Sequence, residues 1–224
     1  MILKSGGNIM QYGNYALDFQ GGDPYNPLNL PPFTIRCKFS SGYTPTMGDS
    51  QTLVDAEENV WDIYKNSTDW SRLLRDDKQN ILELLGANST GVTNMRNMFF
   101  ECSALTSLTI FDTSSVTNMA WMFNSCSSLT TVPLFNTSSC TNMNYMFNYC
   151  DALEEIPLFD TSSVSNMIYT FYECINVRTG ALALYQQAST QPNPPSDHFG
   201  TFDSCGINTI TGAAELAQIP DDWK

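Results

Sequence analysis

The residues of this sequence that could do chemistry are its seven cysteines, its ten methionines and its one histidine. Methionine and cysteine are soft metal ligands, and they gather in stretches such as V-T-N-M-A-W-M-F-N-S-C at residues 116–126. A thiolate beside an imidazole could instead act as a nucleophile, and Cys205 follows His198 by seven residues. The sequence contains no C-x-x-C pair and no second histidine, so the residue types do not favour a zinc site.

The carboxylates are numerous, but their spacing favours solvated charges over catalysis. The acidic doublet Glu154–Glu155 is typical of a solvated surface rather than of an acid–base pair. The column Asp112, Asn136 and Asp160 could bind a hard cation such as calcium, although D-T-S-S is also an ordinary turn composition. We therefore predict no catalytic residue, no metal site and no cofactor, and hence no enzyme.

The charge distribution argues against nucleic-acid binding. The chain carries 23 acidic and 10 basic residues, and no lysine or arginine occurs between Asn97 and Val177. A nucleic-acid surface needs cations that neutralise phosphates, and an anionic membrane surface needs them too. No run approaches the roughly 18 apolar residues of a membrane span, so membrane insertion is not expected. The first residues also lack the basic, apolar and small-residue segments of a signal peptide.

The spacing of the cysteines indicates a tandem repeat. Four of them are 24 residues apart, and the stretches around them are alike. In three of the four copies, two methionines, a phenylalanine and the cysteine stand at i, i+3, i+4 and i+7. In one copy these are Met119, Met122, Phe123 and Cys126. This spacing predicts one buried face of a short helix in every copy.

A second pattern follows this segment in every copy. Aliphatic residues recur at L-x-x-L-x-L spacing, as in Leu129, Val132 and Leu134, which is typical of a leucine-rich-repeat strand. A turn such as F-D-T-S-S closes each copy. We therefore predict an α/β repeat fold, a leucine-rich-repeat solenoid of 24-residue strand-turn-short helix units that cover one another's apolar faces.

Two columns of the repeat are predicted to be structural. The cysteines belong to the apolar stripe, and Cys140 fills a position held elsewhere by valine, so buried free thiols are expected. Asparagine amides in register can bond along the stack and to the turn backbone. The predicted structural ladder comprises Asn94, Asn118, Asn142, Asn166, Cys102, Cys126, Cys150 and Cys174.

The repeat decays toward both ends, which divides the chain into three parts. Residues 66–178 form the repeat array, and residues 179–224 hold altered repeats that are expected to form a cap. Within residues 1–65, F-T-I-R-C-K-F alternates apolar and polar side chains like a half-buried strand, and N-V-W-D-I-Y predicts another strand. We predict a small β-rich segment there, which either caps the array or docks the protein onto a partner.

The repeat resembles a known family. The pattern V-T-N-M-x-x-M-F-x-x-C-x-x-L, with a following hydrophobic strand and F-D-T-S-S-V, is similar to the BspA-like leucine-rich repeats of bacterial surface proteins. The resemblance is close over residues 90–180 and extends over 66–224 with degenerate ends. It implies an exposed protein associated with adhesion and host contact. Similar repeats in phage-encoded proteins imply a virion component as another setting.

One column of the predicted helix faces solvent and is rich in aromatic residues. It reads Asn97, Trp121, Tyr145 and Tyr169, and a second varied column adds one aromatic residue in the first and one in the last of these copies. Those additions are Phe100 and Tyr172. Exposed apolar strips mark contact surfaces, and Trp and Tyr are favoured anchors of binding sites. The strip either contacts a ligand or packs against itself or a neighbouring protomer.

Two functions from different classes follow from these observations. The first is a non-catalytic recognition or adhesion module on a virion or bacterial exterior, which binds a cell-surface glycan or protein ligand. The second is a structural virion or assembly component in which the repeats are a stable spacer. In that second function residues 1–65 would dock onto virion or other assembly proteins. Formation of a homo-oligomer is compatible with both.

Overall fold

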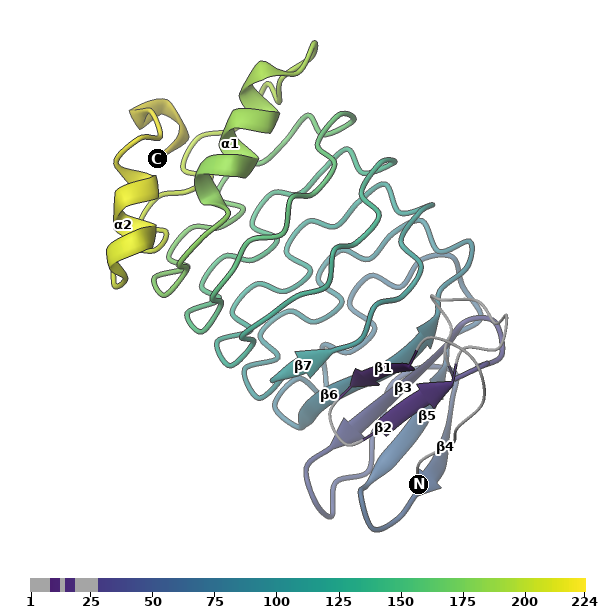
Figure 1. Cartoon of the computed structure of the whole chain (residues 1–224). Coiled ribbons are helices and arrows are strands. Elements are labelled where there is room, and N and C mark those ends of the chain that lie inside the picture. The colour runs from purple at the N-terminus through teal and green to yellow at the C-terminus, as the bar shows by residue number, and fades with distance from the viewer. Residues whose placement is uncertain (1–8, 13–14, 19–27) are drawn as a thin grey trace.

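The computed structural model describes residues 9–12, 15–18 and 28–224 (Figure 1). The elements are β1 (Ile9–Tyr12), β2 (Tyr15–Asp18), β3 (Thr34–Phe39), β4 (Ser50–Asp55), β5 (Val60–Tyr64), β6 (Ile81–Asn88), β7 (Ser107–Leu108), α1 (Ala181–Thr190), α2 (Ile210–Leu216) and the 3-10 helix η1 (Asp221–Trp223). A sheet lies at one end of the molecule, a stack of irregular coils follows it, and the two α-helices lie at the far end. Most residues on which the signal-peptide prediction rests lie outside the described ranges.

The sheet is built around β3. Its strand order is β4-β5-β3-β6-β7, and β1 and β2 form a separate antiparallel pair. Ile35, Cys37 and Phe39 of β3 are buried, which confirms the alternating strand predicted from F-T-I-R-C-K-F. β5 confirms the strand predicted from N-V-W-D-I-Y, and it pairs antiparallel with β3.

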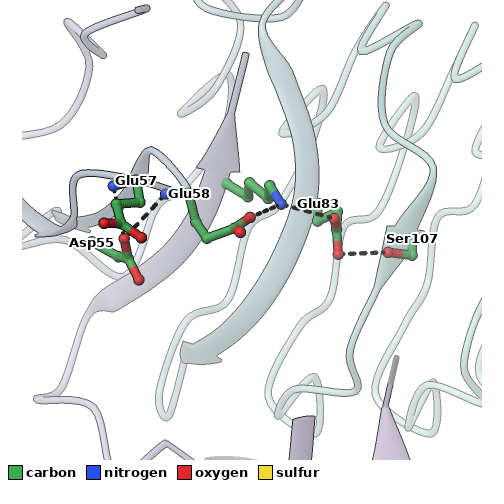
Figure 2. Close-up of polar contacts among 6 residues, drawn as sticks. Asp55, Glu57, Glu58, Glu83 and Ser107 are labelled. Carbon is green, nitrogen blue, oxygen red and sulfur yellow. Dashed lines mark hydrogen bonds and ion pairs between the residues drawn. The ribbon is translucent and has the colours of Figure 1, made fainter. Parts of the chain in front are cut away.

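The strand β6 joins this sheet to the coils. It pairs antiparallel with β3 on one side and parallel with β7 of the next coil on the other. A row of polar contacts crosses the same strands, as Figure 2 shows. Lys38 of β3 bonds to Glu58 and lies 4.0 Å from Glu83 of β6, which accepts a 3.5 Å hydrogen bond from Ser107 of β7. Asp55 accepts two backbone hydrogen bonds in the turn that carries Glu58. The N-terminal sheet is therefore continuous with the coils.

Successive coils are joined by backbone hydrogen bonds from alternate residues. The N–H of Met119 donates to the carbonyl of Asn142, and that of Trp121 donates to Asn144, both at 3.0 Å. Other residues of the segment bond within their own coil. The N–H of Met122, for example, donates to the carbonyl of Met119 at 3.2 Å. The same pattern recurs in the preceding and following copies. Each 24-residue copy is therefore a series of tight turns whose backbone groups bond alternately to the next coil and within their own coil.

The predicted solenoid of strand-turn-short helix units is wrong. Regular structure in the described residues consists of one open five-stranded mixed sheet, the β1–β2 pair and short helices, and no α-helix occurs at the methionine-rich segments. Two residues of each segment have left-handed backbone angles, for example Trp121 at φ 61° and Ser125 at φ 59°. A right-handed helix cannot contain such residues, because a left-handed L-residue costs about 1–2 kcal/mol and breaks the i to i−4 bonding.

The predicted repeat strand is also mostly absent. Among the copies of the described array, only those at β6 and β7 form a strand there, and the N–H of Thr109 just beyond β7 donates to Leu84 of the preceding coil. The two following copies have Pro133 and Pro157 at the position of Thr109, and proline has no N–H to donate. The leucine that follows each proline is part of the apolar pattern of the predicted strand. Leu134, one of these leucines, is 56% exposed.

A column of phenylalanines occupies the core of the stack. The rings of Phe99, Phe123, Phe147, Phe171 and Phe202 are within 8° of parallel between successive coils. Their centroids are 5.1, 5.3, 5.3 and 5.9 Å apart along the column. All five rings are buried, and the rings of the neighbouring coils contribute to covering each of them. An isolated copy would thus leave its largest apolar side chain exposed to water.

The cysteines line the same core as free thiols. All seven are buried, and no disulfide joins them. Cys126, Cys150 and Cys174 each donate an S–H hydrogen bond of 3.1–3.2 Å to a carbonyl of the preceding coil. Cys140 lies at the buried position that valine occupies in other copies. These thiols therefore act as small core side chains with a weak donor.

The C-terminal residues close the last coil. α1 and α2 both lie in the altered repeats of residues 179–224, and the Thr209 side chain at the start of α2 accepts from the Gly212 N–H. The backbone of Phe202 donates to the carbonyl of Trp223, whose indole stacks on the same phenylalanine. The aromatic column therefore ends under Trp223 rather than in solvent. No helix within the described ranges is long and apolar enough to cross a bilayer.

We expect alkaline pH to destabilise the fold through its thiols. Burial raises the pKa of Cys140 from 9.0 to about 11, so above pH 9 the unfolded thiol ionises while the folded one does not. The contribution is complete below pH 9 and is lost as pH rises toward 11. The measurement is urea unfolding with reductant at pH 8 and pH 10. Between these two pH values, the free energy of unfolding of Cys140→Val should fall by about 1 kcal/mol less than that of wild type. Equal losses would contradict the raised pKa.

The left-handed positions should reject β-branched side chains. At Ser125, valine should be less stable than glycine by about 1–2 kcal/mol, because only glycine adopts φ 59° without strain. Both substitutions remove the same hydroxyl. Ser127, two residues on, has no left-handed angle, and there glycine should be the less stable of the two. Thermal unfolding of the four variants measures both differences, and valine and glycine of equal stability at Ser125 would refute the strain.

Candidate ligand-binding face

The first left-handed position of each coil sets its side chain on one face of the stack. Trp121, Tyr145 and Tyr169 occupy this position with φ between 53° and 61°, and their N–H groups donate to the following coil at 2.8–3.1 Å. Neighbouring residues add further rings to the same face. We call the set Phe100, Trp121, Tyr145, Tyr149, Tyr169, Tyr172 and Phe199 the aromatic strip.

The rings of the strip contact one another from coil to coil. Trp121 and Tyr145 are stacked with centroids 4.0 Å apart, and Tyr145 and Tyr169 are 5.2 Å apart and tilted. Gly200 lies against Tyr169, and a Cβ at this glycine would be 2.4 Å from that ring. All three rings keep part of their surface exposed. Mutual packing therefore aligns the rings without removing them from solvent.

The structure gathers every predicted ligand-binding candidate on this one face. Asn97, Phe100, Trp121, Tyr145, Tyr169 and Tyr172 are all half-buried. The sequence reasoning missed Tyr149, which is 46% exposed and meets Tyr172 edge to face at 5.5 Å. It also missed Phe199, which meets Tyr169 edge to face at 5.6 Å. Tyr149 lies at the second left-handed position of its coil, and a helix would have placed that position on another face. Phe199 lies in the last interval of the repeat, which is longer than the others.

Two shallow hollows lie on the strip. The tyrosine hollow is lined by Tyr145, Asn148, Tyr149, Tyr169 and Tyr172. Asn148 is only 6% exposed, and its Oδ1 has no hydrogen-bond partner among the described residues. Such an acceptor is costly to bury unless a ligand or solvent group satisfies it.

Two tyrosines of this hollow, Tyr145 and Tyr172, have a raised pKa and stay protonated at neutral pH. Burial, and then Tyr169, raises the pKa of Tyr145. Tyr149 is the main cause that raises the pKa of Tyr172. Each hydroxyl can therefore donate as well as accept a hydrogen bond. The hollow offers ring faces and hydroxyl groups, and the amide of Asn148 lies in its lining.

The second hollow, which we call the arginine hollow, lies toward the N-terminal end of the strip. Arg72, Arg75, Asn97, Phe100 and Trp121 line it. Arg72 has the left-handed angle of the strip column, at φ 61°, so the column begins one coil earlier than the sequence reasoning placed it. A one-residue insertion before Ile81 hides this equivalence in the sequence.

The structure gives His198 and Cys205 separate packing roles. The imidazole stacks on Trp223 at 4.3 Å, with Nδ1 3.0 Å from the Pro195 carbonyl and Nε2 3.5 Å from Asp222. Cys205 is buried, and burial raises the pKa of its thiol. No hydrogen bond or ion pair between the histidine and this cysteine occurs in the described part of the chain.

The polar columns bond to their own turns. The side chains of Asn94, Asn118, Asn142 and Asn166 each accept from the N–H two residues on, at 3.0–3.1 Å. The asparagine backbones pair in parallel from coil to coil. Asp112, Asn136 and Asp160 likewise each accept from a serine N–H two residues on. Within the described ranges, no group of three His, Cys, Asp or Glu side chains could hold a metal ion.

Comparison with known proteins bears on the repeat array. The family model described as "Mycoplasma protein of unknown function, DUF285" matches residues 68–183, just over half of the chain. The match gives a coarse link to BspA-like proteins. No curated protein and no solved structure matches the chain. The matched range contains both hollows and every ring of the aromatic strip except Phe199.

Proposed function

The chain belongs to the family described as a Mycoplasma protein of unknown function, DUF285, and on that premise we propose that it is a non-catalytic recognition module. Its ligand is a glycan that lies along the aromatic strip. The observation that carries this proposal is the tyrosine hollow, which is lined by four tyrosines and by Asn148, a residue whose Oδ1 has no partner among the described residues. Ligand sites typically combine an aromatic lining with a few placed polar groups.

The chemistry of the strip suits a saccharide. One face of a pyranose ring carries C–H groups, which are attracted to the negative face of an aromatic ring. The hydroxyls around the sugar edge can bond to tyrosine O–H groups and to an amide oxygen. Trp121 and Tyr145 give adjacent rings, and Tyr169 extends them by one coil. A repeating ligand could therefore engage successive coils.

A binding role fits the burial of the reactive groups better than catalysis does. All seven thiols are buried, and the single imidazole is stacked on Trp223. A nucleophile must reach its substrate and be activated by a nearby base. The exposed aromatic rings need no such activation to bind. We therefore keep the proposal of a protein without enzymatic activity.

The setting of this recognition is part of the proposal. The resemblance to BspA-like repeats suggests display on a bacterial or virion exterior and contact with a cell-surface ligand. Leucine-rich repeats of that kind also occur in phage-encoded proteins, which suggests the virion as one setting. The ligand partner is then a surface glycan, and a surface protein is the outcome to be distinguished from it.

We expect the double substitution Trp121→Asn/Tyr145→Asn to abolish glycan binding without unfolding. Asparagine tolerates the left-handed angle, and Asn97 already occupies this column in the preceding coil. Loss of both rings should weaken binding by at least about 30-fold, as for other buried aromatic anchors. The measurement is binding of the purified chain to a glycan array and to bacterial cells, with circular dichroism as the folding check.

The control variant is Leu134→Asn/Leu158→Asn. These leucines are 56% and 52% exposed, and they lie outside the aromatic strip. This variant should bind like wild type, because it removes exposed apolar surface of another part of the coils. Cell binding without glycan binding would favour a protein ligand. No binding by folded wild type would refute recognition and favour a structural component with the strip as an assembly contact.

A further inference from the structure

The arginine hollow differs from the rest of the strip in its charge. Arg72 and Arg75 line it in a chain whose formal net charge is −13. Their side chains make no ion pair or hydrogen bond with any described residue, and both are exposed. Six other basic side chains of the described part are paired with carboxylates. Two unpaired guanidinium groups thus face one hollow despite an excess of acids elsewhere.

The hollow exists because a small residue interrupts the strip column. Asn97 lies between Arg72 and Trp121 in this column, and the three coils after it carry Trp121, Tyr145 and Tyr169. The core rings Phe99 and Phe123 of the Asn97 coil and the Trp121 coil are 5.1 Å apart, which gives the spacing of the stack at this point. An asparagine fills less of this space than a ring does. The remaining gap can admit one planar or chair-shaped ring.

The indole of Trp121 has one face that no parallel ring covers. Tyr145 stacks on it at 4.0 Å from the following coil. On the side of the preceding coil, Phe100 is 6.1 Å away and tilted by 56°. Lys78 lies over the Phe100 ring at 6.0 Å and is held by Glu101, so this lysine is already paired. The open indole face and the unpaired arginines therefore border the same hollow.

We infer that the arginine hollow binds an acidic sugar, a pyranose that carries a carboxylate. The inference rests on the proposed glycan-binding function and names the chemical class of the ligand. The sugar ring lies against the open face of Trp121, and its carboxylate meets Arg72 and Arg75. The planar guanidinium fork matches a carboxylate and forms charge-assisted hydrogen bonds with it. The side chain of Asn97 makes no hydrogen bond within the described residues. Its amide hydrogen-bonds to a sugar hydroxyl.

The two hollows would then bind different parts of one ligand. The tyrosine hollow lies two coils further along and contains no charged side chain. Neutral sugar units would occupy it, while the acidic unit stays at the arginines. This arrangement orients the ligand along the stack. It also makes binding of the acidic unit sensitive to salt, because exposed charges are screened.

The test compares matched acidic and neutral saccharides. The probes are a galacturonic acid trimer against its methyl ester, and sialyllactose against lactose, titrated into the full chain at low and physiological salt. We expect one acidic member to bind at least about tenfold more tightly than its neutral partner. Arg72→Asn and Arg75→Gln should each remove that preference. Asparagine is chosen at Arg72 because it tolerates φ 61°.

The matched control is Arg96→Gln. Arg96 is exposed and unpaired within the described residues, like the other two arginines, but it does not line the hollow. This variant changes net charge equally and should keep the acidic preference. Equal loss in all three variants would reduce the effect to net charge and overturn the inference. Equal binding of acidic and neutral probes, or no binding of either while other glycans bind, would also overturn it and leave the proposed function standing.

Discussion

The hydrogen bond from alternate backbone N–H groups to the next coil is the constraint on which the rest of the structure depends. It fixes the offset between coils, because the N–H groups of Met119 and Trp121 donate to the carbonyls of Asn142 and Asn144. It also requires turns rather than a helix, since a helix would use the same N–H groups internally. The left-handed angles at Trp121 and Ser125 are local strain that these bonds offset. Every column of side chains inherits its spacing from this register.

The same register produces a core ladder and a surface ladder. Inside, phenylalanine rings repeat at 5.1–5.9 Å and bury one another from coil to coil. Outside, the left-handed position carries Trp121 and the tyrosines that stack beside it. The core ladder is uniform because each ring must fit the same space. The surface ladder varies from Arg72 to Asn97 to Trp121, and this variation is where ligand discrimination can arise.

The chain separates its reactive groups from its contact groups. The thiols that first suggest chemistry are buried, and several donate to carbonyls of the preceding coil. The side chains that line the two hollows are aromatic rings, asparagine amides and the two unpaired arginines Arg72 and Arg75. The ends are closed differently, by a sheet that shares β6 with the first coil and by Trp223 over the last phenylalanine. These caps leave the coils between them to present one continuous face.

The sequence by itself determined the 24-residue register, the buried column of Met119, Phe123 and Cys126, and the aromatic residues that share one face. Those features depend only on which residues recur together, so they hold whether a copy folds as a helix or as turns. Only the tertiary structure decided the backbone of each copy, the exposure of Leu134 and the two hollows. The reason is that a left-handed Trp121 is unfavourable locally and is stabilised by a carbonyl of another coil. No local pattern contains that partner, and the gap at Asn97 exists only once neighbouring coils set its walls.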